Sequence, residues 1–227
     1  MKDTAIVLLS GGQDSTTCLG WASQQFDCTA LSIFYGQKHA AELKAAERIA
    51  AHFGVERLVE QIPTLQNIGG SALVGDGELA ADGGYGDREA PGGLPTSFVP
   101  GRNVLFLSIA AAVAVKRGIR HIVTGVCQTD YSGYPDCREE FVQAMERALN
   151  LAMPSDAGPI QIHTPLMHLS KAQTVQMARN LGDETWDALG MSLTCYNGIT
   201  GGCGACPACT LRAKGFAEAG FTDPARG

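Results

Sequence analysis

The chain of 227 residues has little charge, and little positive charge in particular. Charged residues make up 18%, and 17 Lys and Arg against 23 Asp and Glu give a net charge of −6. A protein that grips nucleic acid through its phosphates needs a basic surface, so this balance argues against a nucleic-acid partner. It leaves room for a small anionic substrate held at a local site. The 45% share of hydrophobic residues is that of a globular protein.

Long hydrophobic runs are also missing. The longest, from Val104 to Val115, is interrupted by Ser108 and is shorter than the roughly 20 residues that span a bilayer. The first residues lack the pattern of a secretory signal peptide. We therefore expect a cytoplasmic protein with no membrane partner. That compartment disfavours disulfides, so the eight cysteines need another explanation.

Several common catalytic motifs are absent. The chain has no GxxxxGK[ST], GxGxxG, HExxH or G-x-S-x-G pattern. These absences argue against an ordinary γ-phosphate-cleaving P-loop enzyme, a zincin and a serine hydrolase. The five histidines form no metal-binding array, and we expect each to be structural.

Short apolar runs alternate with helical patterns along most of the chain. The runs predict strands over 4–9, 30–35, 57–62, 119–125 and 161–164. The spacing of apolar residues predicts helices over 15–25, 40–53, 103–116, 138–152 and 170–181. We expect the almost wholly apolar helix 103–116 to be buried. The alternation predicts an α/β fold with an open, mostly parallel, doubly wound sheet, whose ligands lie beyond the carboxyl ends of the strands.

Two segments interrupt this alternation. Residues 63–101 hold ten Gly and four Pro, and a loop this long is usually a lid, a binding loop or a disordered segment. We expect it to order over bound substrate. The second segment, 195–209, holds half of the cysteines. We expect one domain over 1–227, with a Gly-rich insertion at about 63–101 and a cysteine segment at about 193–212.

The loop after the first strand reads Ser10-Gly-Gly-Gln-Asp-Ser15. Glycines let the backbone approach a ligand closely, and the free N–H groups at the start of the following helix attract anions. Asp14 would repel a phosphate, so it holds a magnesium ion or caps the helix. A tight strand-to-helix turn alone would also account for the two glycines.

Four cysteines follow the spacing Cys195-x7-Cys203-x2-Cys206-x2-Cys209, with glycines between them. Four thiolates suit a tetrahedral zinc ion, although closely spaced C-x2-C runs also hold iron–sulfur clusters. Nothing else in the chain indicates electron transfer, so we favour one zinc ion per chain. The other cysteines, which are scattered, are expected to be small buried hydrophobes: Cys18, Cys28, Cys127 and Cys137.

The SGGxDS string resembles the pyrophosphate loop of the ATP pyrophosphatases, which include GMP synthetase, NAD synthetase and asparagine synthetase. Those enzymes cleave ATP between the α and β phosphates and adenylate their substrate. The segment Thr164-Pro-Leu-x-x-x-Ser-Lys171 resembles the proline–leucine–lysine segment that they carry late in the fold. We therefore expect Lys171 to contact phosphate rather than to be a surface lysine.

Further segments extend the resemblance to one family over essentially the whole chain, the 7-cyano-7-deazaguanine synthases. They are LLSGGQDSTTC (8–18), YGQKH (35–39), FVPGRN (98–103), TGVCQTDYSGYPDCR (124–138), TPL (164–166) and LTCYNG with GCGACPAC (193–209). The resemblance implies the adenine nucleotide alpha-hydrolase-like fold and a ligase that converts 7-carboxy-7-deazaguanine, ammonia and ATP into the nitrile. It also implies a homodimer, ATP bound with Mg²⁺, and a structural zinc on Cys195, Cys203, Cys206 and Cys209.

The resemblance also assigns site residues. The nucleotide loop maps onto Leu8, Leu9, Ser10, Gly11, Gly12, Gln13, Asp14, Ser15, Thr16, Thr17 and Cys18. Catalysis by positioning and by neutralising phosphate charge would use Lys171 and Arg102, with Asp14 holding the magnesium ion, although Arg102 could also be a surface arginine. A guanine-like base needs an acceptor for its N1–H and exocyclic amine, for which Asp130 and Asp136 are candidates, although Asp in such loops is often a turn cap.

Two other functions stay open on the sequence. One is another ATP pyrophosphatase, such as a tRNA-thiolating enzyme, which would usually need a basic surface. The other is a zinc-bearing regulatory module with an inactive nucleotide loop. Release of AMP in the presence of carboxy-deazaguanine and ammonium separates the three.

Overall fold

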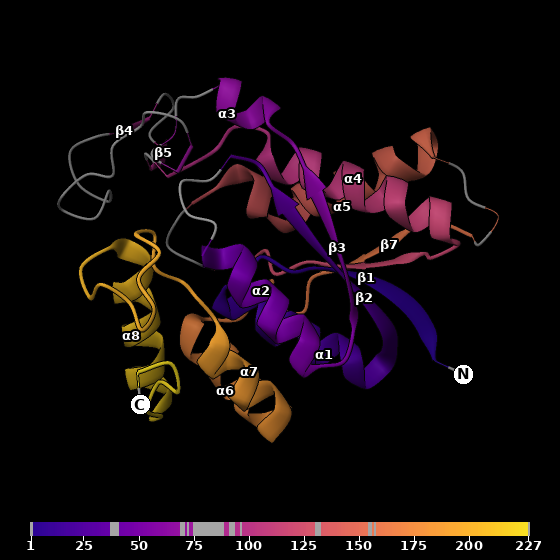
Figure 1. Ribbon diagram of the computed structural model, residues 1–227. Coiled ribbons are helices and arrows are strands. Elements are labelled where there is room, and N and C mark those ends of the chain that lie inside the picture. Colours follow the sequence, from indigo (N-terminus) through magenta and orange to yellow (C-terminus); the bar gives the residue numbers. More distant parts are fainter. Residues whose placement is uncertain are drawn as a thin grey trace.

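The computed structural model describes residues 2–36, 41–68, 71, 73–74, 89–90, 94–95, 97–129, 133–153, 156 and 158–226. Five parallel strands form one sheet with helices on both faces (Figure 1). Its order is β3-β2-β1-β6-β7. The strands are β1 (Asp3–Leu8), β2 (Phe26–Phe34), β3 (Glu56–Gln61), β6 (His121–Val123) and β7 (Gln161–His163). The prediction of an open, parallel, doubly wound sheet is confirmed.

All five predicted strands are present, although β2 begins four residues before the predicted start. The helices are α1 (Gln13–Gln25), α2 (Ala41–His52), α3 (Thr64–Ile68), α4 (Arg102–Arg117), α5 (Glu139–Ala152), α6 (Lys171–Asn180), α7 (Asp183–Met191) and α8 (Pro207–Ala219). Two antiparallel strands of two residues each, β4 (Glu89–Ala90) and β5 (Leu94–Pro95), lie within the Gly-rich segment, most of which falls outside the described residues. Its expected ordering over substrate therefore stays a prediction. Helices α3, α7 and α8 were not predicted.

The core has two layers, one on each face of the sheet. In β1, Ala5 and Val7 pack with α1 and α2, whereas Ile6 points to the opposite face and packs with α4. All three side chains are fully buried, which is why the strand is a continuous apolar run rather than an alternating one. Figure 1 shows α1 and α2 on one side of the sheet and α4 and α5 on the other.

The expectation that the apolar helix 103–116 is buried is met on one stripe of α4 only. Its buried stripe consists of Leu107, Ala110, Ala111 and Ala114, which face the sheet. Val104 is 39% exposed, and Ile109 and Val113 are only partly buried. The helix forms the outer layer of a two-layer packing, so a single stripe is enough to cover the sheet.

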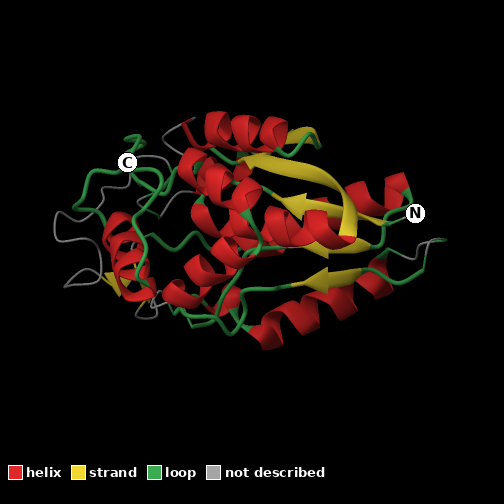
Figure 2. Ribbon diagram, turned by 90° about the horizontal axis from the view of Figure 1, so that it is seen from below, coloured by secondary structure: helices red, strands yellow, loops and turns green. Residues whose placement is uncertain are grey.

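The carboxyl ends of the strands point toward the side of the molecule where α8 lies (Figure 2). β1 lies between β2 and β6, so the order reverses there, and a crevice at such a switch point is where doubly wound folds bind ligands. Among the described helices, none is long and apolar enough to cross a membrane.

Candidate active site

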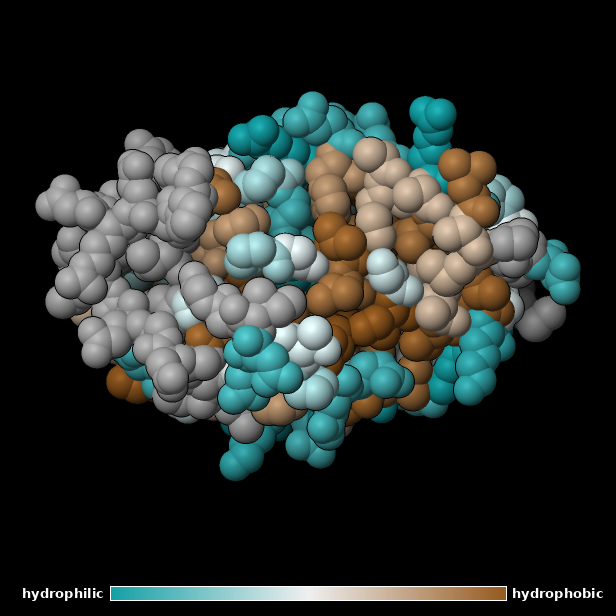
Figure 3. Space-filling model, turned by 90° about the horizontal axis from the view of Figure 1, so that it is seen from above, coloured by the Kyte–Doolittle hydropathy of each residue, from teal (hydrophilic) through white to brown (hydrophobic). Residues whose placement is uncertain are grey.

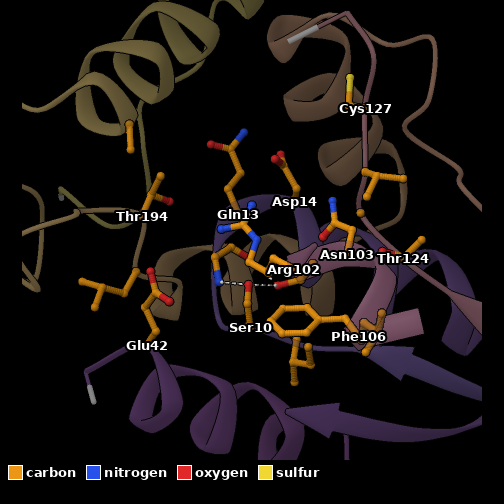
Figure 4. Close-up of a pocket in the computed structure, with 18 of the residues that line it drawn as sticks. Ser10, Gln13, Asp14, Glu42, Arg102, Asn103, Phe106, Thr124, Cys127 and Thr194 are labelled. Atoms are coloured by element: carbon orange, nitrogen blue, oxygen red, sulfur yellow. Dashed lines mark hydrogen bonds between the residues drawn. The ribbon is translucent and has the colours of Figure 1, made fainter. Parts of the chain in front are cut away.

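A cavity of about 360 Å³ opens at this carboxyl edge. It is lined by the loop after β1, the first turns of α1, α2, α4 and α6, the loop after β6, and the C-terminal segment around α8 (Figure 4). Its volume lies within the range of small-molecule sites. Most of the motifs identified in the sequence therefore meet around one cavity.

The loop after β1 is a compact turn held by its own hydroxyl groups. Ser10 Oγ lies 3.1 Å from Ser15 Oγ and accepts a 3.3 Å bond from the Gly12 N–H. Gly11 has a φ of +91°, and a Cβ there would lie 2.3 Å from the Glu42 carbonyl oxygen. Glycine is therefore required at Gly11 by both the backbone angle and the contact with α2.

Helix α1 begins without a side-chain cap. Its N-cap is Gly12, and no side chain accepts a bond from the first turn. The first N–H groups of a helix have no partner within it, so they form an anion-binding site together with the helix dipole. Asp14 is the second residue of the helix and does not cap it.

Asp14 and Lys171 are 157 positions apart in the sequence and form an ion pair. Lys171 Nζ donates to Asp14 Oδ1 at 3.0 Å and to Oδ2 at 2.9 Å. A capping box of Ser170 and Gln173 begins α6 and places Lys171 as its first residue. The lysine stem packs against Gly215 of α8, where a Cβ would lie 2.6 Å from Lys171 Cγ. The structure thus brings two predicted site residues together at the N-terminus of α1.

Gln13, beside Asp14, is buried without a partner. The residue is 3% exposed, and neither its Nε2 nor its Oε1 has a hydrogen bond within the described structure. It lines the cavity together with Leu193 and Thr194 of the C-terminal segment.

Arg102, the first residue of α4, lies in the cavity with Tyr35 and Glu42. Burial raises the pKa of the Glu42 carboxyl to about 7, although the charge of Arg102 opposes this rise. Burial also raises the pKa of Tyr35, again against the effect of Arg102. Of the described residues that line the cavity, Asp14 and Glu42 carry carboxylates. Glu42 was not predicted as a site residue, and its one signal in the sequence is its place in the first turn of the helix after β2.

Asp136 lies beside this region, but its carboxylate already accepts a hydrogen bond from the first turn of helix α4. Its Oδ2 accepts a 3.3 Å bond from the Asn103 N–H, and Asn103 Nδ2 donates to the Asp136 carbonyl oxygen at 2.9 Å. Asp136 is 7% exposed and is not among the described residues that line the cavity. Asp130 lies outside the described residues.

The four cysteines of the C-terminal segment come together as one cluster. The Sγ atoms of Cys195, Cys203, Cys206 and Cys209 all lie within 4.8 Å of one another. A tetrahedral zinc ion with bonds of about 2.3 Å requires thiolates about 3.8 Å apart, so the cluster fits such an ion. Between the cysteines, Gly202 has a φ of +90° and a Cβ there would lie 3.0 Å from Cys209 Sγ. The cluster could therefore hold a metal ion.

The cysteine segment is joined to the nucleotide loop. The Leu193 N–H donates to the Gly11 carbonyl oxygen at 2.8 Å. Arg212 of α8 donates to Ser192 Oγ and Thr194 Oγ1 and forms a buried pair with Asp223, with Nε–Oδ2 at 2.7 Å. Thr194, Cys195 and Leu211 line the cavity, so this segment forms one of its walls.

Comparison with known proteins agrees with these features. The profile of the family described as "Queuosine biosynthesis protein QueC" matches residues 4–220. A protein of Chromobacterium violaceum named 7-cyano-7-deazaguanine synthase is 53% identical over 98% of this chain and 92% of its own length. Proteins of the same name from Laribacter hongkongensis and Bacillus subtilis are 55% and 46% identical, over 97% and 96% of this chain and 93% and 95% of their own lengths. The chain therefore belongs to the QueC family of queuosine biosynthesis proteins.

Proposed function

We propose that this chain is an ATP-dependent ligase that converts 7-carboxy-7-deazaguanine and ammonia into 7-cyano-7-deazaguanine for queuosine biosynthesis. The relatives of 46% to 55% identity carry the name of that enzyme. The structural observation that carries the proposal is the meeting of the uncapped start of α1 with the Asp14–Lys171 pair in one cavity. That arrangement suits a nucleoside triphosphate that is cleaved between its α and β phosphates.

The phosphates are held by the N–H groups at the start of α1 and by the hydroxyls of Ser10 and Ser15. Lys171 exchanges its bond to Asp14 for one to phosphate and neutralises the charge of the departing pyrophosphate. Asp14 would hold the Mg²⁺ that accompanies ATP, and the ion would supply positive charge to the phosphate oxygens. Arg102, which also lines the cavity, contributes a second fixed positive charge.

Both activations take place at this loop. In the first, the carboxylate attacks the α-phosphorus of ATP and releases pyrophosphate; ammonia then displaces AMP, loses a proton and leaves the amide. In the second, the amide oxygen attacks a second ATP and again releases pyrophosphate. Loss of the two N–H protons and departure of AMP then form the nitrile. Each nitrile thus consumes two ATP, both cut to AMP and pyrophosphate.

The residues that line the cavity indicate which carboxylate binds the base. A guanine-like edge presents two parallel N–H donors, which a carboxylate accepts in a bidentate manner. Asp14 is engaged with Lys171, and the Asp136 carboxylate with Asn103. We therefore assign base recognition to Glu42, with Asp136 positioning the first turn of α4 and so Arg102. The role of Asp130 stays a prediction.

The cysteine cluster holds one zinc ion in a structural role. Four thiolates close a tetrahedral shell and leave no position for substrate. A cubane iron–sulfur cluster places several atoms between the cysteines and so spreads their sulfurs more widely than the 4.8 Å found here. The ion would fix the wall of the cavity that Leu193 and Thr194 form. Metal analysis separates the two cases, because an iron–sulfur protein is brown and a zinc protein is colourless.

The protein is a homodimer joined through the exposed face of α4. Figure 3, seen from the side on which Figure 1 draws α4 and α5, shows apolar side chains gathered on that surface. Val104, Ile109 and Val113 keep apolar surface in contact with solvent there. Sedimentation analysis of the wild type and of Ile109→Asp tests this assignment, which predicts a dimer for the first and a monomer for the second.

The function is tested by incubating the purified chain with 7-carboxy-7-deazaguanine, ammonium and ATP. We expect the mass of the nitrile as product, with AMP and pyrophosphate. AMP formation only with tRNA and a sulfur donor would favour the thiolating enzyme, and no AMP with any substrate would favour the regulatory module.

A further inference from the structure

Among the described residues that line the cavity, Gln13 is a buried polar side chain whose amide has no hydrogen-bond partner. It is the first residue of α1, is 3% exposed and lines the cavity, and both its amide oxygen and its amide nitrogen are unbonded in the described structure. Its neighbours in the loop differ, because the hydroxyls of Ser15, Thr16 and Thr17 all donate to backbone carbonyl oxygens.

An unpartnered buried amide is costly. A hydrogen-bonding group that loses water without gaining a partner destabilises the folded state, whereas an apolar side chain of the same shape at that position does not. A buried polar group without a partner therefore calls for an explanation, and a ligand that enters the cavity supplies one. The group would then be paired only when the substrate is bound.

The position of Gln13 identifies the part of the substrate that it meets. It precedes Asp14, whose carboxylate bonds to Lys171 where the phosphates would lie. Figure 4 shows the Gln13 side chain standing beside Asp14 on the side toward Thr194. The substrate atom bonded to the α-phosphate is the oxygen of the reacting carboxyl or amide, so the first residue of α1 lies next to the reacting carbon rather than next to the base.

We propose that the Gln13 side chain binds the reacting carboxyl-derived group of the substrate and retains the amide intermediate between the two adenylations. This inference rests on the function proposed above. The Gln13 Nε2–H donates to the carbonyl oxygen of the intermediate, and Oε1 accepts one N–H of the new amide. A primary amide offers one acceptor and two donors, so two amides can pair with each other through two parallel hydrogen bonds.

This pairing has a kinetic consequence. AMP and pyrophosphate leave after the first half-reaction, and a second ATP must enter the same loop. The amide must stay bound while the nucleotide exchanges. Gln13 is a residue of α1 itself, so its hold on the amide does not depend on the nucleotide.

The test uses Gln13→Met, which keeps length and flexibility but removes both polar atoms, and Gln25→Leu on the same helix as the matched control. Gln25 is exposed and donates to the Trp21 carbonyl oxygen at 3.5 Å, away from the cavity. Each protein is given 7-carboxy-7-deazaguanine, ammonium and ATP, and free amide and nitrile are counted. We expect the ratio of released amide to nitrile to rise about tenfold in Gln13→Met, with a similar rise in KM for supplied amide. The control matches the wild type.

A second readout separates this role from a structural one. Because the described structure gives the Gln13 amide no hydrogen-bond partner, we expect the Tm of the Gln13→Met protein to equal or exceed that of the wild type. A fall in Tm relative to Gln25→Leu, or an unchanged ratio of amide to nitrile, overturns the inference. Gln13→Glu, which keeps the acceptor and loses the donors, also raises amide release if the inference holds. A wild type that forms no nitrile refutes the proposed function itself, whereas a normal wild type with an unchanged Gln13→Met refutes only the role of Gln13.

Discussion

Replacing Glu42 by Gln gives a change in stability whose pH dependence follows from the structure. Glu42 lies in the cavity close to Arg102 and Tyr35, and burial raises its pKa from 4.5 to about 7 against the pull of Arg102. In the unfolded chain the carboxyl ionises near pH 4.5, so between these two values the folded state binds the additional proton. The free energy of unfolding of the wild type therefore falls as the pH rises through this window.

The size of the effect follows from the pKa difference. Each pKa unit is worth 1.36 kcal/mol, so a rise from 4.5 to about 7 corresponds to about 3 kcal/mol as an upper bound, since the side chain keeps some contact with solvent. Glu42→Gln keeps the shape and removes the titration. We expect the variant and the wild type to be equally stable near pH 4.5. At pH 8 the free energy of unfolding of the variant should exceed that of the wild type by roughly 2 to 3 kcal/mol, and this difference should not grow above that pH.

Urea denaturation of both proteins without ligands at pH 5, 6, 7 and 8 measures this difference directly. The comparison cancels all groups that titrate alike in the two proteins. A difference that is independent of pH, or a variant that becomes less stable as the pH rises, would refute the burial of an ionisable Glu42. At pH 8 the same variant should raise KM for 7-carboxy-7-deazaguanine if Glu42 reads the base.

Three further substitutions test other parts of the site. Cys203→Ser should lower zinc content and the free energy of unfolding together, because metal binding contributes folding energy; metal analysis and denaturation show this, and a brown wild type with stoichiometric iron would contradict it. Gly215→Ala places a Cβ 2.6 Å from Lys171 Cγ and should slow AMP formation about tenfold, with unchanged kinetics as the contrary result. Arg212→Met leaves the buried Asp223 carboxylate without its partner and should cost about 3 to 5 kcal/mol in urea denaturation; a loss below about 1 kcal/mol would show that the pair is dispensable.

Strand β1 could be predicted because it is a continuous apolar run followed closely by two glycines. The run from Thr4 to Leu9 needs burial on both faces, which a parallel sheet between helices supplies. The sequence also predicted a helix over 170–181, and in the structure α6 begins at Lys171 with Ser170 as its N-cap. Helix α8 was missed because its first turn lies inside the cysteine segment, where glycines and prolines hide the helical pattern.

The contacts of the site were less predictable, because they join distant parts of the chain. Nothing local to Asp14 indicates that its partner is Lys171, 157 positions later. In the sequence, Asp136 looks like a carboxylate that binds a ligand. In the fold, its Oδ2 accepts a hydrogen bond from the Asn103 N–H. Glu42 resembled an ordinary surface residue of an amphipathic helix, and only the packing of α2 against the nucleotide loop brings it to the cavity.

The central claim is that one nucleotide loop carries out two successive adenylations, and the most direct test is to count AMP per nitrile with the acid and the amide supplied separately. The account predicts two AMP per nitrile from 7-carboxy-7-deazaguanine and one from the amide. It also predicts that Asp14→Ala slows both reactions by the same factor. ADP as the main nucleotide product, or an Asp14→Ala protein that loses only one of the two reactions, would contradict it.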